Sequence, residues 1–67
     1  MGRSRIGTKI KRLREQKEMT QEQLARKAGM HRVGLAKIES GERPNPGVLT
    51  VKKIAKALSV PITDLLD

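Results

Sequence analysis

The stretch Thr20–Gly41, TQEQLARKAGMHRVGLAKIESG, contains two short helical patterns separated by a glycine. Thr20 and Gln23 form the pattern of a capping box, in which the hydroxyl and the amide satisfy free backbone N–H groups at a helix start. Gly29 adopts positive φ without steric cost, so it can end this helix and turn the chain sharply. The pattern predicts a first helix over about 21–28.

A second helix is predicted directly after this turn, over about 32–40. Leu35 and Ile38 share one face of it, and Gly41 follows as a stop signal. Ala25, in the preceding helix, is small, as required where two helices cross nearly at right angles and almost touch. We therefore expect Ala25, the glycine turn and the two apolar anchors to fix the geometry of the pair.

Three further helical segments are predicted around this pair. The first runs from about Ser4, as N-cap, to Lys17, with apolar residues at helical spacing. The next follows a loop rich in glycine and proline and ends near Ser59; its apolar stripe is Val48, Val51, Ile54, Ala55 and Leu58. A last helical turn or two is expected at Ile62, Leu65 and Leu66. With no strand pattern, the fold class is all-α, five short helices in one domain over residues 1–67.

The composition excludes several classes of site. The 67 residues include no cysteine and no Phe, Tyr or Trp, so the core must be aliphatic and the aromatic platforms of single-strand and RNA binders are missing. A single histidine and the lack of a glycine-rich phosphate loop argue against an enzyme, a metal site or a cofactor. Without an apolar run of the ~20 residues that span a bilayer, or a signal peptide, we expect a cytoplasmic protein.

The formal net charge of +8 is concentrated in the first two thirds of the chain. Residues 1–43 hold twelve Lys and Arg against five Asp and Glu, whereas residues 44–67 hold three against two. A positive field on one side attracts polyanions, so we expect the basic half to face its partner. The alternative is a solvated surface that only keeps the protein soluble.

Three runs of residues carry a family resemblance: 20–29, 38–41 and 54–58, reading TQEQLARKAG, IESG and IAKAL. Together they resemble the phage repressor and Cro-type (XRE-like) helix-turn-helix family over nearly the whole chain. The resemblance implies a lambda-repressor-like fold with its helix-turn-helix at about residues 21–40. It also implies a sequence-specific regulator of transcription, most often a repressor, whose third helix reads a palindromic operator in the major groove of double-stranded DNA.

The resemblance assigns DNA contacts by position. The residues that match base-reading positions are His31, Arg32, Val33 and Lys37. Arginine binds guanine through two hydrogen bonds, valine meets a thymine methyl group, and lysine reaches a second guanine or a phosphate. The residues that match positions contacting the sugar-phosphate backbone are Gln21, Gly34, Ser40 and Arg43.

Plainer alternatives exist for these assignments. Arg32 and Lys37 can belong to an ordinary solvated helix face, and Val33 can be a core residue. His31 is more often a residue at a helix entrance than a base reader. Gln21 can be a solvent-exposed residue of a first helical turn.

Arg14 and Glu39 lie where the family places an ion pair between the first and third helices, and we expect this pair to be structural. Two positions depart from the family pattern. His31 replaces the usual Ser or Thr at the start of the reading helix and is a weaker N-cap. Gly34 stands where a longer polar residue is common, and we hypothesise that it lets the backbone approach a phosphate closely.

The expected partners are duplex DNA and a second copy of the chain. The resemblance favours a homodimer, with Pro61, Ile62 and Leu65 as candidate contacts, although Ile62 and Leu65 can equally close the core. Two alternatives to a repressor remain. One is an antitoxin-type module that grips a protein partner as well as its operator, and the other is a non-specific nucleic-acid binder that acts through charge alone.

Overall fold

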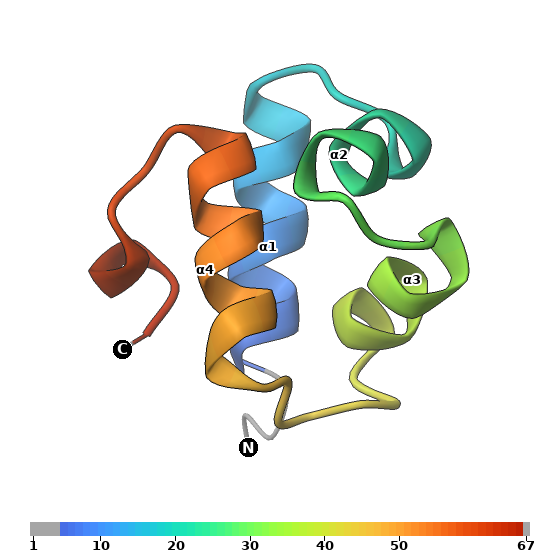
Figure 1. The fold of residues 1–67 in the computed structure, drawn as a ribbon, viewed down its shortest axis with the longest axis vertical. Helices are drawn as coiled ribbons and strands as arrows, with labels where there is room; N and C mark the ends of the chain where they lie inside the picture. The colour runs from blue at the N-terminus through green and yellow to red at the C-terminus, as the bar shows by residue number, and fades with distance from the viewer. Residues whose placement is uncertain (1–4, 67) are drawn as a thin grey trace.

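The computed structural model describes residues 5–66, and this part of the chain is all-helical (Figure 1). The elements are α1 (Arg5–Gln16), α2 (Gln21–Ala28), α3 (Arg32–Ser40), α4 (Val48–Leu58) and the 3₁₀ turn η1 (Ile62–Asp64). The all-α prediction and the helix pair at 21–40 are confirmed. The fifth predicted helix is a single 3₁₀ turn, because a segment this short cannot nucleate an α-helix. The predicted N-cap Ser4 lies outside the described residues.

Local capping interactions set the ends of α2 and the end of α3. The Thr20 hydroxyl accepts a hydrogen bond from the Gln23 N–H at 3.0 Å, and the Thr20 N–H donates to Gln23 Oε1 at 2.8 Å. Gly29 and Gly41 end α2 and α3 in the left-handed region, at φ 69° and 88°. His31 precedes α3 without a side-chain capping bond, as expected of a weak cap.

One aliphatic core joins the helices. Figure 1 shows α1 and α4 next to each other, with α2 and α3 on one side of them and η1 on the other. Every helix contributes to the core, whose largest fully buried side chains are Ile10, Leu24, Leu35, Ile38, Ile54, Leu58 and Leu65. Ala25 is buried as well, at the position where a small side chain is expected. No helix within residues 5–66 is long and apolar enough to cross a bilayer.

One apolar residue, Val48, lies elsewhere than predicted, and for Leu65 the structure decides between two stated alternatives. Val48, expected in the apolar stripe of α4, is 69% exposed, because the first turn of this helix extends beyond the core. Leu65, a candidate dimer contact, is 1% exposed and closes the core from the C-terminal side. Of its two companions, Ile62 packs partly against the core and Pro61 is exposed. Leu65 is therefore a core residue in this chain.

Candidate nucleic-acid interface

The outer face of α3 presents three of the four predicted base-reading side chains to solvent. At 100° per residue, Arg32, Val33 and Lys37 fall in one sector of the helix, whereas the buried residues of α3, Leu35 and Ile38, fall in the opposite sector. All three outward residues are exposed, and Val33 is 61% exposed. The alternative of a core valine is therefore wrong.

A shallow hollow of about 350 Å³ lies against this face, between α3 and the start of α2. Five of the predicted contact residues line it: Gln21, Arg32, Val33, Lys37 and Ser40. Side chains from the start of α2 and from the length of α3 thus line one concave surface. It carries two cationic groups, an amide and a hydroxyl, which are the groups that bind phosphates and base edges.

Two further residues line the hollow that the sequence analysis did not single out. Ala36 lies one helical turn after Arg32, so the spacing of the outward residues already placed it there. Because its methyl group is short, the centre of this face is recessed between the longer side chains around it. Glu42 follows α3 in an irregular segment, where no periodicity predicts which way a side chain points. This carboxylate is the acidic group on an otherwise basic wall.

The other three predicted DNA contacts do not line the hollow. His31 is exposed at the entrance to α3. Arg43 is exposed in the following loop, which its backbone N–H ties to the carbonyl oxygen of Lys37 at 3.0 Å. Gly34 lies on the flank of α3, where a Cβ would meet only Met30 Cε at 3.6 Å. Neither Gly34 nor its neighbour Met30 lines the hollow.

The predicted ion pair between α1 and α3 is present. Arg14 donates from Nε to Glu39 Oε2 at 2.8 Å and from Nη2 to Glu39 Oε1 at 3.0 Å. Its remaining nitrogen, Nη1, donates to the carbonyl oxygen of Met19 at 2.8 Å, which holds the turn before α2. Both side chains are buried, at 11% and 3% exposure. The planar guanidinium is matched to a carboxylate in two-point geometry.

A third side chain joins this pair. Gln21, at the first position of α2, donates from Nε2 to Glu39 Oε1 at 3.1 Å and is half-buried. The alternative of a freely solvated first-turn glutamine is therefore wrong. The hydrogen bond to Glu39 raises the pKa of Arg14, burial opposes this effect, and the negative charge of Glu39 adds to it. Arg14 stays charged throughout the physiological pH range.

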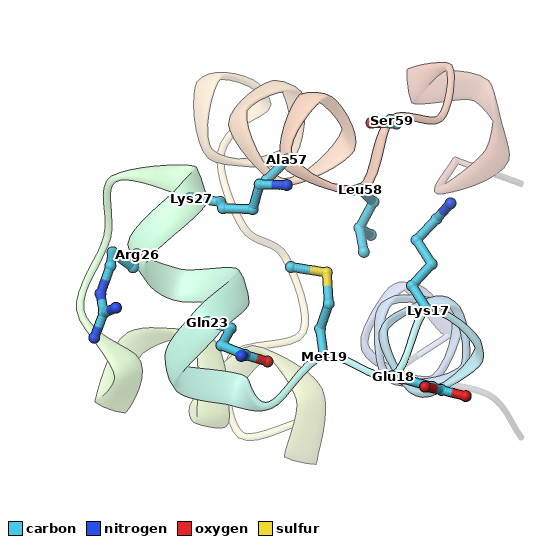
Figure 2. A pocket seen from close by; sticks show the side chains of 9 residues that line it. All are labelled: Lys17, Glu18, Met19, Gln23, Arg26, Lys27, Ala57, Leu58 and Ser59. Carbon is cyan, nitrogen blue, oxygen red and sulfur yellow. The ribbon is translucent and has the colours of Figure 1, made fainter.

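A second hollow has a volume of about 500 Å³ (Figure 2). It is bounded by the turn before α2, the outer face of α2 and the end of α4, and Met19 reaches into it between these elements. It shares no residue with the hollow at α3. Within residues 5–66 no group of three or more His, Cys, Asp or Glu gathers as ligands for a metal ion.

Residues 10–65 match the profile of a family described as Helix-turn-helix. This chain belongs to the helix-turn-helix family. The HTH-type transcriptional repressor RghR of Bacillus subtilis strain 168 is 38% identical over 61 residues, which cover 91% of this chain and 45% of that protein. The immunity repressor protein of Bacillus phage phi105 is also 38% identical over 61 residues, covering 91% and 42%. The resemblance to phage repressors is confirmed.

Two solved structures have the same fold as this chain. The N-terminal DNA-binding domain of SinR from Bacillus subtilis superposes with a TM-score of 0.91 at 34% identity, over 96% of this chain and 93% of that one. The restriction-modification controller protein C.AhdI from Aeromonas hydrophila gives 0.90 at 30% identity, over 96% of both chains. This helix-turn-helix chain spans less than half the length of the curated repressors it matches.

Proposed function

We propose that this chain is a DNA-binding domain that recognises a specific duplex sequence and regulates transcription, acting as a repressor. The observation that carries the proposal is the solvent-exposed face of α3, with Arg32, Val33 and Lys37 on one sector beside Gln21. A major groove about 12 Å wide admits one α-helix, and this sector then points at the base edges. The repressors among its relatives support the same function.

The side chains divide into two groups in this proposal. Arg32 binds guanine through two hydrogen bonds, Val33 contacts a thymine methyl group and Lys37 reaches a second guanine or a phosphate. Gln21, Ser40 and Arg43 bind the sugar-phosphate backbone and set the register of α3 along the groove. His31 extends the reading face at its N-terminal end, and Gly34 remains a candidate for close backbone approach.

We also infer that two copies bind a palindromic site. A lone short reading helix contacts few base pairs, and a symmetric dimer doubles the contacts on a site with matching symmetry. Because Leu65 is in the core, a dimer contact at η1 uses the exposed Pro61, the outer part of Ile62 and the 49% exposed Leu66. Sedimentation of the chain, with and without the DNA duplex that it selects, measures whether it forms a dimer.

Selection from a pool of randomised duplexes tests the proposed function. A sequence-specific regulator enriches one sequence, which unrelated DNA in excess fails to displace. The selected sequence is expected to consist of two inverted halves whose centres lie about 34 Å, or one helical turn, apart. A protein that binds through charge alone enriches no sequence, and the logarithm of its binding constant falls linearly with the logarithm of the salt concentration. That second result would refute specific recognition.

A further inference from the structure

The buried carboxylate of Glu39, in α3, is shared by two other helices. Its Oε2 accepts from Arg14 of α1, and its Oε1 accepts from both Arg14 and Gln21 of α2. The two bonds from Arg14 already neutralise the charge and satisfy the geometry of a buried ion pair. The bond from Gln21 is therefore additional to what the brace between α1 and α3 requires.

This additional bond fixes how the Gln21 amide lies. A carboxylate only accepts hydrogen bonds, so it holds the nitrogen end of the amide inward and excludes the flipped orientation. The nitrogen carries two hydrogens, of which Glu39 takes one. No other hydrogen bond of this amide occurs within the described residues. The side chain is thus ordered at the edge of the hollow before any ligand arrives, so little rotamer freedom is lost on binding.

We propose that Glu39 is a positioning residue for DNA binding: through Oε1 it holds the Gln21 amide so that its second N–H donates to a phosphate oxygen of the duplex. This inference rests on the proposed function of the hollow at α3. Arg14 supports this role, because its positive charge cancels that of Glu39 and so prevents the carboxylate from repelling the phosphate. The ion pair then orients a DNA contact as well as bracing α3.

Gln23, two residues further along α2, offers a matched control. The Gln23 amide acts as an acceptor, because its Oε1 accepts from the Thr20 N–H. The Gln21 amide instead acts as a donor, from Nε2 to Glu39. Gln23 lines the second hollow (Figure 2), which shares no residue with the hollow at α3. Gln23→Met should therefore weaken the cap of α2 and leave DNA affinity unchanged.

The test compares Gln21→Met with the double variant Arg14→Met/Glu39→Met. Replacing both ion-pair partners by apolar side chains of similar volume removes the carboxylate without stranding a buried charge, so we expect the fold to be retained. The probe is the duplex that the unaltered chain selects from the randomised pool. Each of the two variants should lose about tenfold in affinity for every sequence, with the base preference unchanged.

Combining the substitutions separates positioning from bracing. If Glu39 acts through Gln21, adding Gln21→Met to the double variant costs less than about twofold further, because the contact is already lost. Two independent losses that multiply would overturn the proposal, and so would a double variant that binds like the unaltered chain. If the unaltered chain selects no duplex, the proposed function fails first, which is a different outcome.

Side-chain amide NMR gives a second measurement that survives a folding failure of any variant. The chain has only four side-chain amides, so assignment is direct: Gln16, Gln21, Gln23 and Asn45. In the unaltered protein, adding the selected duplex should shift the Gln21 amide protons and leave those of Gln23 in place. If the Gln21 amide resonances do not shift while the backbone resonances of α3 do, the result would contradict the proposal.

Discussion

Gly7 of α1 lies directly against the carbonyl oxygen of Ile38 near the end of α3. A Cβ at position 7 would overlap that oxygen and would lie 3.1 Å from the carbonyl oxygen of Glu39 and 3.2 Å from its Cα. All three neighbours are backbone atoms, so none can rotate away as a side chain does. The missing side chain of Gly7 therefore sets how closely α3 packs on α1.

Gly7→Ala should lower the free energy of unfolding by about 1 to 3 kcal/mol, the usual cost of overpacking a well-filled interior. Alanine in a helix interior gains roughly 1 kcal/mol over glycine, which does not offset the forced separation of α1 from α3. Urea unfolding followed by circular dichroism measures the change. An alanine variant at least as stable as the unaltered chain would show that α3 does not depend on this contact.

Gly34→Ala is the same substitution in a place with room for it. Its Cβ would make only an ordinary contact with Met30 Cε at 3.6 Å, so the helix-propensity gain of roughly 0.5 to 1 kcal/mol should appear as added stability. Affinity for the selected duplex decides the role of the glycine. A loss supports close backbone approach to a phosphate at this position. Unchanged affinity would remove that hypothesis and leave Gly34 without a part in binding.

Arg14→Lys keeps the charge of the ion pair and loses its two-point geometry. We expect the free energy of unfolding to fall by about 1 to 3 kcal/mol at pH 7, because one ammonium group cannot replace three directed N–H contacts. The pKa of Arg14 is raised. The contribution of its charged form to the free energy of unfolding is therefore present below the ordinary arginine pKa and is lost only at extreme alkaline pH. Lysine deprotonates earlier. The difference between the two proteins should widen above about pH 10.4, and a pH-independent difference would contradict the account.

Glu42→Gln should strengthen binding to all duplex sequences about equally, by roughly two- to fivefold at low salt, because it removes a carboxylate from the hollow that we propose binds DNA. The gain should shrink as salt screens the charge. Glu22→Gln is the control, since Glu22 is an exposed carboxylate of α2 that pairs with Arg26 outside the hollow. A gain confined to particular base pairs would mean that Glu42 reads a base.

Most of the fold could be predicted because its signals are local. The capping box at Thr20 and the glycines that end α2 and α3 act within a few residues, and their boundaries agree with the structure. Periodicity gives the angular face of a helix but not where the core ends along its axis, which is why Val48 was misplaced. The C-terminal segment, expected as a helical turn or two, is a single 3₁₀ turn, because a few apolar residues cannot distinguish an α-helix from a single turn that closes the core.

The candidate site could be predicted only in part. The outward sector of α3 follows from helical spacing, and the family resemblance identified Arg14 and Glu39 as partners. The bond between Gln21 and Glu39 and the contact of Gly7 with α3 join residues far apart in the sequence. Neither contact has a local signal in the sequence. A glycine inside a helix normally indicates a less stable helix and not close packing against another helix.

The most direct test of the reading face is the base preference of Arg32→Ala compared with Arg43→Ala, each measured by selection from randomised duplexes. Arg32→Ala should lose ~1 to 3 kcal/mol on the preferred site and relax the preference at one base position in each half. Arg43→Ala should weaken binding to all sequences about equally and reduce the salt dependence by about one phosphate contact. If both variants keep the full base preference, α3 does not read the duplex through Arg32, and the account of this interface is wrong.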